Sequence, residues 1–212
     1  WPCALESVLV SLIGSMDTMM VGGLGPSAIA AVGITNQPKF ILLAMIFSLN
    51  VGVTAVVARR KGQNDMDGAN RCLRQCLIVS LALSLLMSLV GYLFARPILL
   101  FAGAQADVID DATAYFEILM LSIVFMSISL TINAAQRGAG NTKISMVTNV
   151  TANVVNVIFN FLLINGVWIF PELGVRGAAI ATVIGNIVGC GVSVFSLLRR
   201  HSFLELRYPC RW

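Results

Sequence analysis

Six long apolar segments make up most of this 212-residue chain, and they set the strongest limit on its fold. Each is about 18 residues or longer, the length that an α-helix needs to cross a bilayer core. A transmembrane barrel would need strands of about ten residues with alternating polarity, and these segments do not alternate. The sequence therefore predicts an all-α membrane protein with six transmembrane helices. The predicted spans are residues 3–23, 40–58, 77–95, 118–135, 144–164 and 177–198.

Composition supports this class of protein. The chain is 58% hydrophobic and 11% charged, whereas soluble domains carry about 25% charged residues. The lipid bilayer is therefore the expected partner, and the net charge of +4 does not indicate nucleic acid. The five cysteines form no CxxC pair, so neither a disulfide framework nor a zinc site is expected.

Basic residues in the connectors predict the orientation. Eleven of the fourteen Lys and Arg residues lie on one predicted side of the membrane. They are found between the second and third spans, between the fourth and fifth spans, and from Arg199 through the tail of residues 201–212. Cytoplasmic loops carry such an excess. We therefore expect a multi-pass protein of the plasma (inner) membrane with both termini in the cytoplasm. The six-helix unit occupies residues 1–200, and both ends of the chain are expected to be truncations.

Asp17 is a lone carboxylate well inside the first span. A charged side chain near the bilayer centre costs about 2.5 to 3.5 kcal/mol on insertion scales, so such a residue predicts a binding or transport site. Helical geometry places Asp17 on nearly the same line as Glu6, opposite a Leu- and Met-rich side. The alternative is a buried Asp that only ties two helices together.

The fifth span carries four asparagines on one narrow face, at spacings of four, three and four: Asn149, Asn153, Asn156 and Asn160. Amides supply neutral oxygens for a cation, or hydrogen bonds between helices. Helix-to-helix bonding is favoured for Asn149 and Asn153. A binding site is favoured for Asn156 and Asn160, because the rise of a helix puts them at a depth similar to that of Asp17.

The sixth span combines small residues with two polar ones. Gly177, Ala181, Gly185 and Gly189 recur every four residues, which is typical of close helix packing. Thr182 and Asn186 lie on a neighbouring line and can offer oxygens to the same cavity. Asn50 and Asn133 are isolated polar residues in other spans, where a helix-to-helix hydrogen bond is the more common role. Asn50, Asn153 and Asn186 are the candidates for a substrate cavity.

Four stretches, in this order and at these loop positions, together resemble the multidrug and toxic compound extrusion (MATE) family of cation-coupled efflux transporters. They are Met16–Gly25 with Ala30–Gly33, Asn50–Gly52 leading to Val57–Gly62, Arg137–Lys143, and Asn156–Asn160 followed by Leu173–Thr182. The resemblance covers nearly the whole chain.

The resemblance implies a twelve-helix antiporter built from two six-helix lobes around a central cavity. This chain would be the N-terminal lobe, without the C-terminal one. Such proteins export amphipathic, often cationic organic compounds in exchange for Na⁺ or H⁺, and they need no organic cofactor. Asp17 would be the coupling carboxylate, completed by Asn156, Asn160 and Thr182, with no metal beyond a possible Na⁺. Many members carry Asp where this chain has Asn160, so its site would hold one formal charge.

Two other kinds of function remain as alternatives. A flippase for lipid-linked sugars is expected to have cationic residues facing its cavity, and these spans contain almost none. An inactive half-transporter fragment is the other alternative, since a single lobe lacks the opposite wall of the cavity. An intramembrane enzyme is not expected, because an aspartyl protease needs two intramembrane Asp and the chain has neither HExxH nor GxSxG.

Overall fold

The computed structural model describes residues 8, 11, 19, 20, 22, 23, 25–106, 108–164, 166, 173–198 and 204. All regular structure in these residues is helical, which confirms the predicted all-α fold. The helices are α2 (Pro26–Gly62), α3 (Met66–Leu93), α4 (Ala95–Phe101), α5 (Ile109–Gly138), α6 (Thr142–Ile164) and α7 (Gly174–Leu198). Five of them are long and apolar enough to cross a membrane. The predicted first span lies almost entirely outside the described residues.

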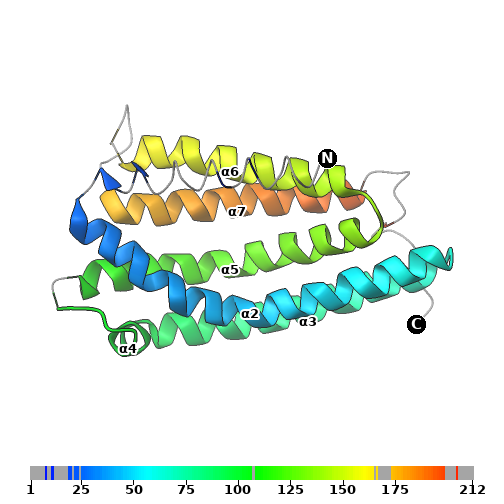
Figure 1. The fold of residues 1–212 in the computed structure, drawn as a ribbon, viewed down its shortest axis with the longest axis horizontal. Coiled ribbons are helices and arrows are strands. Elements are labelled where there is room, and N and C mark those ends of the chain that lie inside the picture. Colours follow the sequence, from blue (N-terminus) through cyan, green and yellow to red (C-terminus); the bar gives the residue numbers. More distant parts are fainter. Residues whose placement is uncertain are drawn as a thin grey trace.

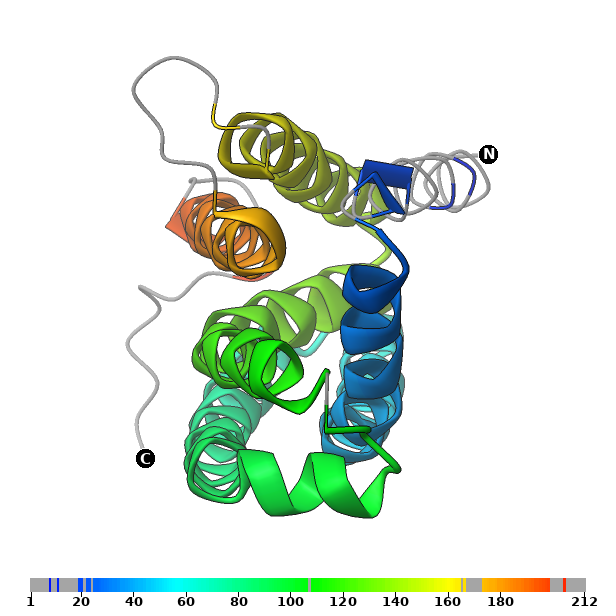
Figure 2. The same cartoon turned by 90° about the vertical axis from the view of Figure 1, so that its left-hand side faces the viewer.

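Helix α5 lies at the centre of the bundle. Figure 1 shows it between a layer formed by α6 and α7 and a layer formed by α2 and α3, and the end view in Figure 2 shows the same order. In the most apolar part of α5, 56% of the residues are buried, against 17–33% in the other four long helices. Every other described helix contacts α5. The bundle is therefore organised as two helix pairs on opposite sides of one central helix.

Apolar packing joins α5 to its neighbours, and large side chains cover the outside. Phe116 and Met120 of α5 are fully buried in a cluster with Leu43 of α2. On the outward faces, Ile41 and Phe195 are among many exposed apolar side chains. In a bilayer such faces lie against lipid, so their exposure agrees with a multi-pass membrane protein.

Helix α2 is much longer than the predicted span 40–58. It begins at Pro26, a residue favoured at the first helical position because its fixed φ suits the helix and its missing N–H needs no partner there. Pro38 lies inside the helix and is buried. A proline inside a helix removes one backbone hydrogen bond and usually marks a break in the helix. The sequence around Pro38 therefore resembles a connector between two spans. Burial of Ala28 and Ala31 on the inner face favours the helix there.

The predicted spans 118–135, 144–164 and 177–198 lie within α5, α6 and α7. The predicted span 77–95 runs two residues past Leu93, where α3 ends. Helix α4 was not predicted as a separate element. Figure 2 shows that it lies across the end of the bundle. It has only seven residues, too few to cross a bilayer.

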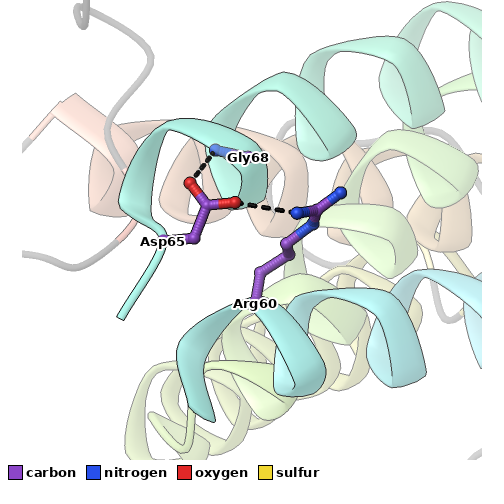
Figure 3. Close-up of polar contacts among 3 residues, drawn as sticks. All are labelled: Arg60, Asp65 and Gly68. Carbon is purple, nitrogen blue, oxygen red and sulfur yellow. Dashed lines mark hydrogen bonds and ion pairs between the residues drawn. The ribbon is translucent and has the colours of Figure 1, made fainter. Parts of the chain in front are cut away.

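Acidic and basic side chains fix the turn between α2 and α3 (Figure 3). The Asp65 carboxylate accepts a hydrogen bond from the Gly68 backbone N–H at 2.8 Å and so caps α3. Its second oxygen lies 2.9 Å from the Arg60 guanidinium. Lys61 donates to the backbone oxygen of Ala139, which lies just after α5. The basic α2–α3 and α5–α6 connections therefore lie at the same end of the bundle.

The capping interaction gives a first prediction. Asp65→Ala should speed amide hydrogen exchange in the first turn of α3, because losing an N-cap costs about 0.5–2 kcal/mol. Asp65→Asn keeps a capping oxygen and should change exchange much less. Arg60→Gln removes only an exposed ion pair and is the control for charge. Equal exchange in Asp65→Ala and the unmodified protein would contradict the capping role.

Candidate functional site

A cavity of about 250 Å³ lies between α5, α6 and α7. Its polar wall comes mainly from α6 and α7, and its apolar wall comes partly from α5. The lining residues are Met126, Ser129, Leu130, Asn149, Ala152, Asn153, Asn156, Thr182, Gly185, Asn186 and Gly189. None of them carries a formal charge.

Three of the residues predicted to form the cation site meet at this cavity. The Asn156 amide nitrogen donates to the Thr182 hydroxyl oxygen at 3.1 Å, and the Asn160 amide nitrogen donates to Asn156 Oδ1 at 3.3 Å. Thr182 donates its own proton to the backbone oxygen of Ala178 at 3.0 Å. Asn160 is fully buried, whereas Asn156 and Thr182 are half-buried and line the cavity.

Glycines on α7 bring the two helices close enough for these bonds. A Cβ atom on Gly185 would lie 2.8 Å from the Ala152 backbone oxygen and 3.0 Å from Asn156 Cβ. A Cβ atom on Gly189 would lie 2.9 Å from Ala152 Cβ. All three distances are too short for ordinary packing, so the predicted packing role of Gly185 and Gly189 is confirmed.

Asn153 and Asn186 also line the cavity, as predicted for cavity residues, although what they bind stays untested. Asn153 donates to the Asn149 backbone oxygen of its own helix at 2.8 Å. Asn50 lies on α2, away from this cavity. It is 7% exposed, and neither of its amide atoms has a hydrogen-bond partner among the described residues. Asp17 lies outside the described residues.

A second set of hydrogen-bonded polar side chains lies where α5, α6 and α7 meet, and the sequence analysis identified only part of it. Asn133 donates to Asn149 Oδ1 at 3.4 Å, which confirms the expected helix-to-helix bond. Ser193 of α7 donates to Asn133 Oδ1 at 3.5 Å and lies 3.0 Å from the hydroxyl oxygen of Ser129. Serines are common in membrane helices, but the four-residue spacing of Ser129 and Asn133 is a signal that both face the same neighbours.

The chemistry of the site suits a small hard cation or water. Among the described residues there is no group of three or more His, Cys, Asp or Glu side chains that could hold a metal ion. Amide and hydroxyl oxygens are hard, neutral ligands, and the Asn156 and Thr182 oxygens each keep a second lone pair. These two oxygens supply a neutral part of the ligand set that a monovalent cation would need.

A helical membrane lobe that encloses a polar cavity near its middle is an arrangement of secondary transporters. The MatE family model matches residues 2–162, about three quarters of the chain. The chain belongs to the MATE family of multidrug efflux transporters. Members of this family are membrane transporters rather than enzymes.

Relatives and solved structures agree with this assignment. A probable multidrug resistance protein NorM from Thermotoga maritima is 26% identical over the whole chain and 46% of its own length. An FAD transporter from Shewanella oneidensis is 28% identical over 95% of this chain and 46% of that protein. These comparisons do not favour a flippase for lipid-linked sugars.

Two solved structures show a similar fold. The inward-facing conformation of a multidrug resistance MATE family transporter has a TM-score of 0.85 at 25% identity, over 93% of this chain and 44% of that one. A MATE in the bent conformation has a TM-score of 0.87 at 25% identity, over 97% and 45%. The chain therefore spans less than half the length of the proteins it matches.

The close contact at Gly185 gives a second prediction. Gly185→Ala should separate α6 from α7 and lower the melting temperature in detergent, because overpacking costs about 1–3 kcal/mol. Gly191→Ala is the matched control on the same helix, since a Cβ atom there meets nothing within 4 Å. That variant should keep or slightly raise the melting temperature. Equal effects of the two substitutions would contradict the packing role of Gly185.

Proposed function

We propose that this chain is the N-terminal lobe of a secondary antiporter that exports amphipathic, often cationic organic compounds in exchange for Na⁺ or H⁺. The observation that carries the proposal is the hydrogen-bonded group of Asn156, Asn160 and Thr182 at the edge of a cavity whose described lining residues are all uncharged, in a chain of the MATE family. The Thermotoga relative, a probable multidrug resistance protein, supports the same substrate class.

The direction of the hydrogen bonds favours a cation over an anion. Asn160 donates to Asn156, Asn156 donates to Thr182, and Thr182 donates to a backbone oxygen. The hydroxyl proton of Thr182 is used in that last bond, so its free lone pair can only accept. A cation in the cavity would find oxygen lone pairs from Asn156 and Thr182.

Asp17 supplies the charge in the proposed mechanism. Its carboxylate would complete the neutral oxygen set, and a bound Na⁺ or H⁺ would neutralise it. Neutralising a charge inside a membrane lowers its desolvation cost, and a ligand shifts a conformational equilibrium by its differential affinity for the two states. Cation binding at Asp17 would in this way bias the transporter between inward and outward openings.

The whole transporter would need a second six-helix lobe. The proteins that this chain matches are about twice as long, and a central substrate cavity requires a wall on each side. We also propose that the end of the bundle formed by the α2–α3 and α5–α6 connections faces the cytoplasm. Lys61 contacts Ala139 there, and Arg60, Lys61 and Arg137 gather at this end.

Substitution of the carboxylate tests the coupling role. In the full-length gene product, Asp17→Asn should slow ion-driven efflux of a cationic dye by about tenfold or more, because bonds to a charged group contribute about 1.5–3 kcal/mol. Asp111→Asn is the control, since Asp111 is exposed in the first turn of α5. Normal efflux by Asp17→Asn in reconstituted vesicles would refute the assignment.

The hydroxyl of Thr182 gives a further prediction. Thr182→Val keeps the shape but removes the oxygen that accepts from Asn156. The concentration of coupling ion needed for half-maximal efflux should rise about fivefold, because one neutral hydrogen bond contributes about 1 kcal/mol. Thr151→Val is the control, since Thr151 lies on α6 but does not line the cavity. An unchanged ion dependence in Thr182→Val would remove Thr182 from the site.

A further inference from the structure

Two fully buried polar side chains near the α5–α6 end of the bundle have no hydrogen-bond partner within the part of the chain that the structure describes. Gln136 of α5 and Thr148 of α6 are each 0% exposed. Among the residues that the structure describes, neither amide atom of Gln136 accepts or donates a hydrogen bond, and the Thr148 hydroxyl also has no partner. Buried polar groups in a membrane helix bundle are satisfied by protein or by water.

Helical geometry directs both side chains toward α7. Gln136 follows Ser129 by seven residues and so lies on nearly the same line of α5, and Ser129 contacts Ser193 of α7. Thr148 precedes Ala152 by four residues on the same side of α6. Ala152 lies against the α7 glycines described above. Both groups therefore belong to the junction of α5, α6 and α7.

These residues continue a row of polar groups that begins at the cavity. Ser129 and Asn149 line the cavity, and both are joined through Asn133 and Ser193. Gln136 and Thr148 come within one turn of that network along their helices.

The row ends at the α5–α6 connection. There the exposed Arg137 guanidinium lies 3.3 Å from the hydroxyl of Ser145, which is buried one turn before Thr148. Figure 1 shows α5, α6 and α7 running side by side toward this end. Each turn between the cavity and the surface thus contributes a hydroxyl or an amide.

We propose that these residues form a hydrated passage, the inner passage, that carries water and with it protons between the α5–α6 end and the cavity. It is defined by Ser129, Asn133, Gln136, Ser145, Thr148 and Ser193. The inference rests on the proposed function in one respect, since the passage would give protons access to the coupling site without crossing the substrate cavity between the lobes.

The chemistry of the passage favours water over a bound ion. Its inward-facing groups are neutral amides and hydroxyls, which donate and accept, as water requires. The cavity at the inner end of the passage, of about 250 Å³, has room for about eight water molecules at roughly 30 Å³ each. A proton can pass along hydrogen-bonded water and hydroxyl groups without any other cation moving through.

Silver-ion accessibility tests the passage directly. The full-length protein is reconstituted in vesicles after its native cysteines are replaced, and Ser193→Cys or Thr148→Cys is introduced. Ag⁺ is small, hydrophilic and thiol-reactive, and it is added on the α5–α6 side. Thiols left after a timed exposure are counted with a fluorescent maleimide on the unfolded protein.

Ala179→Cys is the matched control, because Ala179 is also fully buried on α7 but lies in an apolar cluster. The two passage cysteines should react about tenfold or more faster than this control, which needs a local opening of the fold to react. Equal protection of all three cysteines overturns the proposal.

A second variant separates hydration from local loosening. Gln136→Leu in the Ser193→Cys background should fill the passage and slow the silver reaction about tenfold, with no fall in the melting temperature. An unchanged rate would refute the passage. Neither measurement depends on substrate transport or on Asp17, so failure of the passage and failure of the antiporter proposal give different results.

Discussion

Water is absent from the hydrocarbon interior of a membrane, and the described helices are arranged around the need to satisfy polar groups there without it. This need is greatest for helix α5, because other helices cover it on two sides and it is the most buried of the five long helices. On its α3 side, the Thr131 hydroxyl oxygen lies 2.9 Å from the Ser80 hydroxyl oxygen and 2.9 Å from the Ser127 backbone oxygen, and its single proton serves one of the two. On its α7 side, Ser129 and Asn133 bond to Ser193.

Polar groups are satisfied in different ways on the two sides of α5. Between α3 and α5, the hydroxyls of Ser80 and Thr131 are fully buried and bond directly to each other. Between α6 and α7, small residues bring the backbones close at Gly185 and Gly189, yet the same lack of side chains leaves the cavity beside them. Interhelical bonds average only about 0.6 kcal/mol, so their value lies more in fixing which helices meet than in overall stability.

Local periodicity predicted the spanning helices and the common face of Asn156 and Asn160, whereas the family resemblance implied that Thr182 joins them. Apolar length identifies a span, and a spacing of four identifies a face. The first half of α2 was not predicted as helix, since Pro38 and its polar neighbours resemble a connector until tertiary burial of Ala28 and Ala31 is known.

The position of the cavity among the helices and the part played by its serines could not be predicted for a related reason. A cavity depends on how closely two helices approach, and that distance is set by contacts between residues more than thirty positions apart, such as Ala152 and Gly185. Ser129 and Ser193 acquire a role only through each other. The coupling role of Asp17 remains a prediction, because the residue lies outside the described part of the chain.

Asn160 fixes the orientation of the Asn156 amide, and an aspartate in its place would change that orientation. Its amide nitrogen donates to Asn156 Oδ1, and this bond orients the Asn156 amide so that its nitrogen faces Thr182. A carboxylate cannot donate unless it is protonated, so an aspartate here would place two acceptor oxygens against each other or reverse the Asn156 amide. With Asn160, the orientation of the oxygen ligands is held independently of protonation. In the proposed mechanism, charge and ligand geometry would then belong to different residues, and a change in the occupancy of Asp17 would leave the neutral part of the site in place.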